Sequence, residues 1–248
     1  MHLGIDMGSR TIKFALFKGS ELIEHRVAES GFDPRGQTLA MIGNHAPRRI
    51  TATGYGRHLA RKSFANGVIT EIRAHALGAR HFFPGCRTVL DVGGQDSKVI
   101  ALSPDGRVSN FLMNDKCAAG TGRFLEIMAA SLGFGLDEFG PAAAGSRQGV
   151  AINSMCAVFA ESEVVSLKNR GFAPDDIGRS IHLAVVDRLA GMLERLGGAG
   201  EVVFTGGVAN NPFVVEALQE KLQAPVRVPP LPSIIGAVGA AIHAEKES

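Results

Sequence analysis

Apolar residues recur at helical spacing through one long segment in the second half of the chain. Between Asp176 and Leu196 they fall three or four positions apart, which is the period of a helix that buries one face. A proline-aspartate pair precedes this segment at 174–175 and two glycines follow it at 197–198, as is usual at the two ends of a helix. The pattern therefore predicts a long helix over 176–196.

Shorter apolar stripes follow two cysteines, Cys117 and Cys156, each of which comes after a polar stretch suited to capping. A helix is therefore expected to begin at each of these cysteines. A final helix is expected from about Ile234, and its run GAVGAA (236–241) is small enough for very close packing. Strand-like segments alternate with helical ones in both halves, which predicts an α/β fold.

One strand pattern occurs twice in the chain. Residues 3–17 read LGIDMGSRTIKFALF and residues 89–102 read VLDVGGQDSKVIAL. Aligning Asp6 with Asp91 also superposes a glycine and a lysine of the two copies. Each copy consists of an apolar strand, an acid, a tight glycine turn and a second strand, which predicts a β-hairpin with an acid at its mouth.

These hairpins are suited to phosphate. Glycines let backbone N–H groups approach an anion closely, whereas a carboxylate cannot face phosphate directly and is expected to hold a hydrated Mg²⁺. Two such hairpins facing each other would grip a metal–polyphosphate between two lobes. A third glycine turn, VVFTGGVANN (202–211), is suited to a flat base or ribose. A single glycine turn of this kind is common in proteins. Two repeated hairpins followed by TGG and then GAxGAA form a far more specific signal for a nucleotide site.

The better-known nucleotide motifs are absent from the sequence. No GxxxxGK[ST] occurs, which excludes a P-loop protein, and no GxGxxG occurs, so a Rossmann dinucleotide site is unsupported.

Composition narrows the class of protein. The chain has 248 residues, 45% of them apolar, so one or two buried cores are expected. Its formal net charge is +2 and it contains no basic run, so neither nucleic acid nor a membrane is an expected partner. The sequence shows no secretory pattern and no apolar run long enough to span a bilayer. Its 3 cysteines favour a reducing, cytoplasmic location. We expect one lobe over 1–86 plus 234–248 and a second over 87–233.

Cys117 and Cys156 also predict how the chain assembles. Two thiolates cannot complete a tetrahedral metal site or a four-iron cluster, but two chains related by a twofold axis would supply four. Two cysteines per chain at expected helix starts therefore favour a homodimer with a shared iron–sulfur cluster. The third cysteine, Cys86, directly precedes a strand and is expected to be a small core residue.

The glycine turns, in this order, resemble those of the acetate and sugar kinase, Hsp70 and actin superfamily. Together with the cysteine segments they resemble a narrower family, the ATP-dependent activators of 2-hydroxyacyl-CoA dehydratases, which includes the ATPase subunits of benzoyl-CoA reductases. The resemblance implies a two-lobed, actin-like (ribonuclease H-like) ATPase fold with duplicated phosphate hairpins. The segments that carry it are GIDMGSRTIK, TATGYGR, DVGGQDSK, MNDKCAAGTGRF, CAVFAESEV and TGGVANN.

The resemblance also implies a set of site residues and cofactors, namely ATP, Mg²⁺ and one [4Fe–4S] cluster per dimer. The cluster ligands from each chain would be Cys117 and Cys156. The first phosphate hairpin would comprise Asp6, Gly8, Ser9, Arg10, Thr11 and Lys13. The second would comprise Asp91, Gly93, Gly94, Gln95 and Asp96. The adenosine turn would comprise Gly206, Gly207 and Asn210.

Within this set, three residues are assigned a catalytic role. We expect Gln95 to orient the attacking water, as a glutamine does in other nucleotide hydrolases, with simple hydrogen bonding to phosphate as the alternative. Asp6 and Asp91 are expected to act through the water shell of the metal. Lys13 and Lys98 are expected to face solvent beyond the hairpins, with phosphate contact as the alternative.

The implied function is the transfer of one low-potential electron to a 2-hydroxyacyl-CoA dehydratase, coupled to ATP hydrolysis. A ferredoxin or flavodoxin would reduce the activator again. Helix N-termini at the cluster would favour its reduced state, and nucleotide-driven lobe movement could change that field. Two alternatives stay open, an ATPase subunit of a benzoyl-CoA reductase and a small-molecule kinase without a cluster. The sequence does not specify the acyl-CoA.

Overall fold

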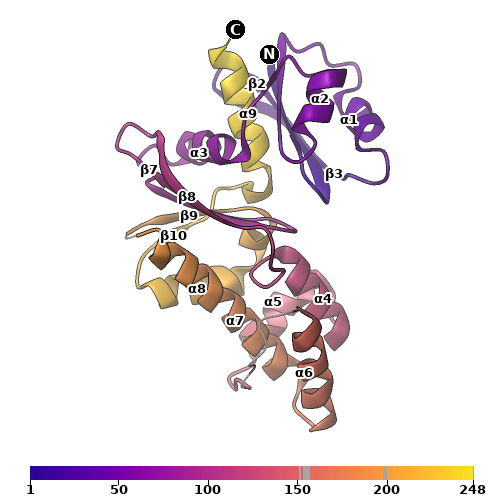
Figure 1. Ribbon diagram of the computed structural model, residues 1–248, viewed down its shortest axis with the longest axis vertical. Coiled ribbons are helices and arrows are strands. Elements are labelled where there is room, and N and C mark those ends of the chain that lie inside the picture. The colour runs from indigo at the N-terminus through magenta and orange to yellow at the C-terminus, as the bar shows by residue number, and fades with distance from the viewer. Residues whose placement is uncertain (151, 153–156, 198–199, 248) are drawn as a thin grey trace. The chain divides into compact units, whose positions relative to one another are not determined.

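The computed structural model describes residues 1–150, 152, 157–197 and 200–247 (Figure 1). The chain divides into two compact units, each of which is described by itself. Unit 1 comprises Met1–Val89, Ile100–Phe111 and Pro229–Ser248, and unit 2 comprises Leu90–Val99 and Leu112–Val228. The boundaries expected for the two lobes stay a prediction.

Sheet A lies in unit 1 and has the strand order β3-β2-β1-β4-β5. Its first two strands form the predicted antiparallel hairpin, in which Asp6 lies opposite Lys13. The fourth strand runs parallel to the first and places Thr53 beside Asp6. The strands are β1 (His2–Met7), β2 (Thr11–Lys18), β3 (Glu21–Glu29), β4 (Arg49–Thr53) and β5 (Gly67–Val68).

Sheet B has the strand order β10-β9-β6-β7-β8. When the five strands of each sheet are numbered one to five along the chain, both sheets have the order 3-2-1-4-5. The duplication seen in the hairpin sequences therefore extends to the whole sheet. Unit 2 contains the ends of β6 and β8, the start of β7, and all of β9 and β10. The prediction of an α/β fold with duplicated hairpins is confirmed. The strands are β6 (Thr88–Val92), β7 (Ser97–Leu102), β8 (Val108–Asn114), β9 (Val202–Thr205) and β10 (Val226–Arg227).

The small residues of the last helix of unit 1 allow it to pack at backbone contact. A Cβ added to Gly239 would lie 1.8 Å from the Ala74 carbonyl oxygen, and one added to Gly4 would lie 1.9 Å from that of Ala237. The helix, α9, therefore lies directly against α3 and β1 (Figure 1), and its predicted start is confirmed within one residue. The helices of unit 1 are α1 (Pro34–Ile42), α2 (Arg57–Ser63), α3 (Glu71–Phe82) and α9 (Ile235–Lys246), with a 3₁₀ turn at Pro232–Ile234.

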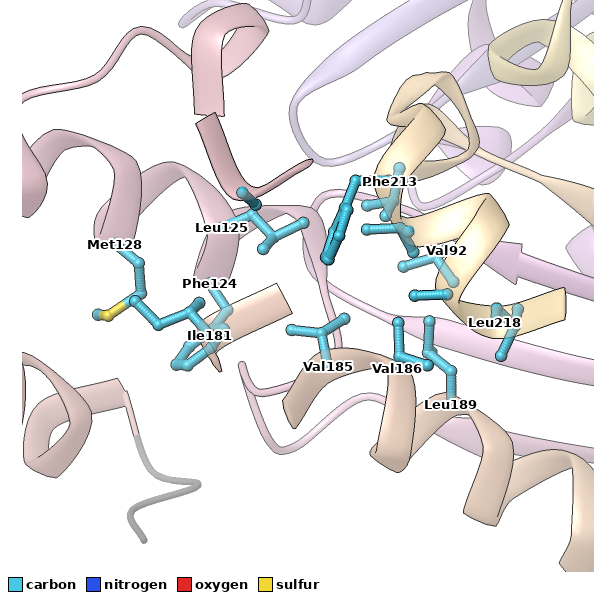
Figure 2. Close-up of a cluster of buried hydrophobic side chains, with 14 of the residues drawn as sticks. Val92, Phe124, Leu125, Met128, Ile181, Val185, Val186, Leu189, Phe213 and Leu218 are labelled. Carbon is cyan, nitrogen blue, oxygen red and sulfur yellow. The ribbon is translucent and has the colours of Figure 1, made fainter. Parts of the chain in front are cut away.

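The core of unit 2 joins the end of β6 to three helices, α4, α7 and α8. Val92, Phe124, Val185 and Phe213 converge in it, and all of these side chains are less than a tenth exposed (Figure 2). Removal of this apolar surface from water is the main favourable contribution to folding of the unit. Its helices are α4 (Gly122–Leu132), α5 (Leu136–Gly145), α6 (Ala157–Asn169), α7 (Pro174–Arg195) and α8 (Pro212–Leu222), with a 3₁₀ turn at Gly207–Asn210.

The predicted long helix is α7, and it begins two residues earlier than expected. Pro174 occupies the first turn and is followed by Asp175 and Asp176, whose charges favour the N-terminus of a helix. The helix ends at Arg195, before Gly197, which has φ +73°. Across the described residues, no helix combines the length and the apolar character needed to cross a membrane.

Candidate nucleotide site and cysteine loop

The first hairpin places a buried acid beside a lysine in unit 1. Asp6, at the end of β1, is 5% exposed, and its Oδ2 lies 3.4 Å from Lys13 Nζ. The turn closes through a hydrogen bond from Gly8 N–H to the Thr11 carbonyl oxygen, at 3.1 Å. Ser9 is exposed at its tip, as is Arg10. The hairpin thus presents polar groups to solvent above a neutralised carboxylate.

The second hairpin repeats this geometry in unit 2. Gly93 N–H donates to the Asp96 carbonyl oxygen at 2.9 Å. Lys98 Nζ lies 3.5 Å from Asp91 Oδ2 and 2.7 Å from Asp96 Oδ1, and all three side chains are buried. Gln95 is exposed at the tip. A charge-neutralised acid with an exposed polar turn above it is therefore present twice in the chain.

The expectation that both lysines face solvent is wrong for Lys98, which is buried, whereas Lys13 stays partly exposed but lies against Asp6. In the antiparallel hairpin the residue seven positions after the acid is its cross-strand partner, as the pairing of Asp6 with Lys13 shows. The side chains of cross-strand partners project to the same face of the sheet, so the lysine ammonium lies next to the carboxylate of the acid. The equal acid-to-lysine spacing in both copies was the sequence signal for this pairing.

The third glycine turn lies beside the second hairpin within unit 2. Thr205 Oγ1, at the end of β9, donates to Asp91 Oδ1 at 3.0 Å. Gly206 has φ +90°, and a Cβ there would lie 2.2 Å from the Val92 carbonyl oxygen, so only glycine fits. A Cβ on Gly207 would meet nothing within 4 Å. Asn210 closes the turn by donating from Nδ2 to the Gly207 carbonyl oxygen at 3.1 Å.

A buried histidine fixes the far end of this turn. His182 Nδ1 donates to the Gly178 carbonyl oxygen at 2.7 Å, and its Nε2 accepts from Asn211 Nδ2 at 3.0 Å. The Asn211 Oδ1 in turn accepts from Val214 N–H at the start of α8. Burial lowers the pKa of His182 to about 4, so the ring is neutral at pH 7 and can accept this hydrogen bond.

Unit 1 has a counterpart of the Thr205-Gly206 pair that sequence reasoning missed. Gly54 has φ +86°, and a Cβ there would lie 2.5 Å from Asp6 Oδ1. The preceding Thr53 is buried, and its Oγ1 has no hydrogen-bond partner within the part of the chain that the structure describes. His75 Nε2 and Asp6 Oδ2 each lie 3.0 Å from the position of a Cβ on Gly236. The repeated Thr-Gly after a strand was the available signal.

The residues fit a Mg²⁺-nucleotide in their chemistry. Carboxylate oxygens are ligands that Mg²⁺ accepts directly or through its waters, and each unit provides one such acid at its hairpin, Asp6 in unit 1 and Asp91 in unit 2. The predicted set therefore falls into two groups. The first hairpin lies in unit 1, whereas the second hairpin and the adenosine turn lie together in unit 2.

Cys117 lies in a loop, so the prediction that a helix begins at this residue is wrong. The loop connects β8 to α4, which begins at Gly122 with Thr121 as its N-cap. Gly120 has φ +87°, a conformation incompatible with a right-handed helix, and it delays the start of α4. Cys156 lies outside the described residues, and α6 begins at the next residue, Ala157.

The thiol of Cys117 fits an iron–sulfur ligand. It is free and partly exposed, and thiolate is the usual protein ligand of such clusters. Within the described ranges, no group of three or more His, Cys, Asp or Glu residues is placed to hold a metal ion. A cluster bound by Cys117 therefore needs further ligands from outside those ranges or from another chain. Cys86 is 3% exposed, which confirms the prediction of a core residue.

Two solved structures are similar to this chain along nearly its whole length. Component A of the Acidaminococcus fermentans (R)-2-hydroxyglutaryl-CoA dehydratase is 40% identical, with a TM-score of 0.93, over 99% of this chain and 98% of that one. The activator of the 2-hydroxyisocaproyl-CoA dehydratase from Clostridium difficile, solved with bound ADPNP, is 37% identical, with a TM-score of 0.91, over 100% and 95%. These similarities confirm the predicted two-lobed, actin-like fold.

A more distant relative belongs to another enzyme system. One of the subunits of benzoyl-CoA reductase from Thauera aromatica is 30% identical over 89% of this chain and 82% of its own length. The BadF/BadG/BcrA/BcrD ATPase family matches residues 3–244, a range that includes both hairpins, the cysteine loop and the third glycine turn. The chain belongs to the BadF/BadG/BcrA/BcrD ATPase family.

Proposed function

We propose that this chain is an ATP-hydrolysing activator that passes single low-potential electrons to a 2-hydroxyacyl-CoA dehydratase. The observation that carries the proposal is the conjunction of two intact acid–lysine hairpins with a free, partly exposed Cys117 in one family member. The 40% identity to an activating ATPase from Acidaminococcus fermentans, over 99% of this chain, supports the same function. A kinase of the same fold would have no use for this thiol.

We assign the binding of the phosphates and of the metal to the two hairpins. Each lysine offsets the charge of its acid, so a polyphosphate can approach without the repulsion of a bare carboxylate. Asp6 and Asp91 would hold the water shell of Mg²⁺, and Gln95, exposed at its turn, would orient the attacking water. Ser9, Arg10 and the glycine turns would contact phosphate oxygens through side-chain and backbone donors. The adenosine would lie on Gly206, Gly207 and Asn210, where Gly207 leaves open space.

We assign the binding of the redox centre to the cysteine thiols. Cys117 and Cys156 of each chain of a homodimer would hold one [4Fe–4S] cluster, which supplies one-electron chemistry when bound. A ferredoxin or flavodoxin would supply the electron in the cytoplasm. The effect of helix N-termini on the cluster stays a prediction, in which Cys117 would act from the loop four positions before the N-cap Thr121 of α4.

Iron content and mass together test this proposal. We expect the anaerobically purified chain to contain about two irons and two sulfides per chain on a homodimer. Cys117→Ser and Cys156→Ser should each lose the iron, whereas the matched control Cys86→Ser should keep it. An iron-free monomer whose ATP turnover depends on a small hydroxylated substrate would overturn the proposal in favour of a kinase.

The similarity to a benzoyl-CoA reductase component from Thauera aromatica supports a second candidate, an ATPase subunit of such a complex. The purified assembly separates the two. A free homodimer that activates an added dehydratase supports the activator, whereas co-purification with larger subunits supports the reductase component.

A further inference from the structure

The loop that carries Cys117 is held at its beginning by one side chain. Asn114 is the last residue of β8, and its Nδ2 donates to the Cys117 carbonyl oxygen at 2.9 Å and to that of Ala119 at 3.3 Å. The same amide nitrogen lies 3.4 Å from Ser97 Oγ, at the start of β7. One amide group thus ties the cysteine loop to the sheet of unit 2.

A second side chain, from α7, holds this asparagine in place. Arg188 Nη2 donates to Asn114 Oδ1 at 3.3 Å, which leaves the Asn114 amide hydrogens directed to the loop carbonyls. The aliphatic part of Arg188 passes the loop at Gly120, where an added Cβ would lie 3.1 Å from Arg188 Cδ. The loop is therefore bonded on one side and packed closely on another.

The other end of the loop is bonded to the second phosphate hairpin. Gly122 N–H donates to the Gly93 carbonyl oxygen and Arg123 N–H to that of Gly94, both at 2.9 Å. These two N–H groups belong to the first turn of α4, where backbone donors have no carbonyl partner within the helix itself. A displacement of the Gly93–Gly94 turn must therefore move the start of α4 or break these bonds.

We propose that Asn114 is the positioning residue through which a change at the Gly93–Gly94 turn reaches Cys117. With both ends bonded, the loop has few dihedral angles left free, so a displacement at the start of α4 must change the position of Cys117. Without Asn114, the loop residues regain conformational freedom, and rotation about their dihedral angles would absorb the same displacement. What the turn binds and what Cys117 holds rest on the proposed function, but the connection between them rests on these hydrogen bonds.

Hydrogen exchange of the full-length, iron-reconstituted protein tests the inference. In the wild type, Mg²⁺-ADPNP should change exchange in both the 93–96 hairpin and the 115–121 loop. In Asn114→Ala, basal exchange of the loop should rise about tenfold, since the loss of hydrogen bonds lowers the free energy of local opening. The ADPNP-induced change in the loop should disappear, while the hairpin still responds and nucleotide affinity stays within about twofold.

Controls distinguish this role from general destabilisation. Asn110→Ala removes an exposed asparagine of the same strand, whose Oδ1 accepts from the N–H of its neighbour Phe111 and which has no other side-chain hydrogen bond to the described residues. This variant should leave the loop response unchanged. Arg188→Met keeps the aliphatic contact but loses the guanidinium, and should give an intermediate loss. If Asn114→Ala fails to fold, the Arg188→Met variant tests the inference in its place. The nucleotide-induced change in the electron paramagnetic resonance signal of the reduced cluster should be lost in parallel.

Two results would overturn the inference. One is a folded Asn114→Ala protein whose loop responds to ADPNP as in the wild type. The other is a wild-type loop that ignores bound nucleotide. Failure of the proposed function would look different, because the wild type would then bind no iron or no nucleotide, while basal exchange of the loop would still show whether Asn114 holds it.

Discussion

Units 1 and 2 repeat one framework, but they satisfy its buried polar groups differently. In unit 2, Thr205 donates to Asp91 and the lysine contacts a second acid, Asp96. In unit 1, threonine stands at the position of that second acid, the Lys13 side chain is 18% exposed, and Thr53 Oγ1 has no described partner. The same strand order thus supports one closed charge cluster and one that stays partly open.

This difference predicts different roles for the two lysines. Lys98 lies between two buried carboxylates, and removal of a buried partner leaves charge that neither water nor protein offsets. Lys13 is partly solvated and pairs with one carboxylate, so its pairing contributes less to stability and leaves the ammonium able to turn toward a phosphate. Equivalent positions in a duplicated fold need not do equivalent work.

The largest expected effect comes from Lys98. Lys98→Met should destabilise the protein by about 3–5 kcal/mol, because Asp91 and Asp96 lose their shared cation. Lys13→Met should cost about 1 kcal/mol or less but should reduce ATP turnover. Urea unfolding and ATPase assays measure both. Equal losses of stability in the two variants would mean that the two charge clusters are equivalent after all.

Acid should weaken unit 2 through His182. The folded-state pKa is lowered to about 4 from 6.5, so the unfolded chain binds a proton at a pH where the folded chain does not. The associated stability is present above pH 6.5 and falls as the pH drops toward 4, by up to about 3 kcal/mol. His182→Gln should unfold more easily at pH 7.5 yet lose less stability between pH 7.5 and 4.5. The same pH slope in both proteins, from urea unfolding, would contradict this assignment.

Three glycines separate a fold requirement from a binding requirement. Gly206→Ala and its counterpart Gly54→Ala should each cost about 2–3 kcal/mol, because both have positive φ and both would place a Cβ against backbone atoms. Gly207→Val enters open space, so it should change stability by less than about 0.5 kcal/mol while weakening nucleotide binding. Thermal unfolding and ADPNP titration measure these effects. Unchanged affinity in Gly207→Val would remove this turn from the nucleotide site.

The smallest expected effects compare the two threonines directly. Thr205→Val removes a hydrogen bond to buried Asp91 and should cost about 1–2 kcal/mol. Thr53→Val replaces a buried hydroxyl that lacks a described partner and should be neutral or slightly stabilising. Urea unfolding of the two isosteric variants provides the measurement. A comparable loss in Thr53→Val would show that this hydroxyl is bonded in solution.

The sequence by itself determined both hairpins, α7, α9 and the family, because each depends on neighbouring residues. Helical spacing, glycine turns and the acid before each turn are local patterns, and their repetition revealed the duplication. The position of Cys117 relative to α4 was not predictable in this way, since a capping-type stretch does not show how many residues precede the first helical turn.

Only the tertiary structure decided which side chains satisfy the buried charges. The pairing of Asp91 with Thr205 joins residues more than 100 positions apart, and it depends on β9 lying next to β6. The hydrogen bond of Arg188 to Asn114 depends in the same way on the packing of α7 in unit 2. Side-chain partners from distant segments follow from sheet order and helix packing, which no local spacing encodes.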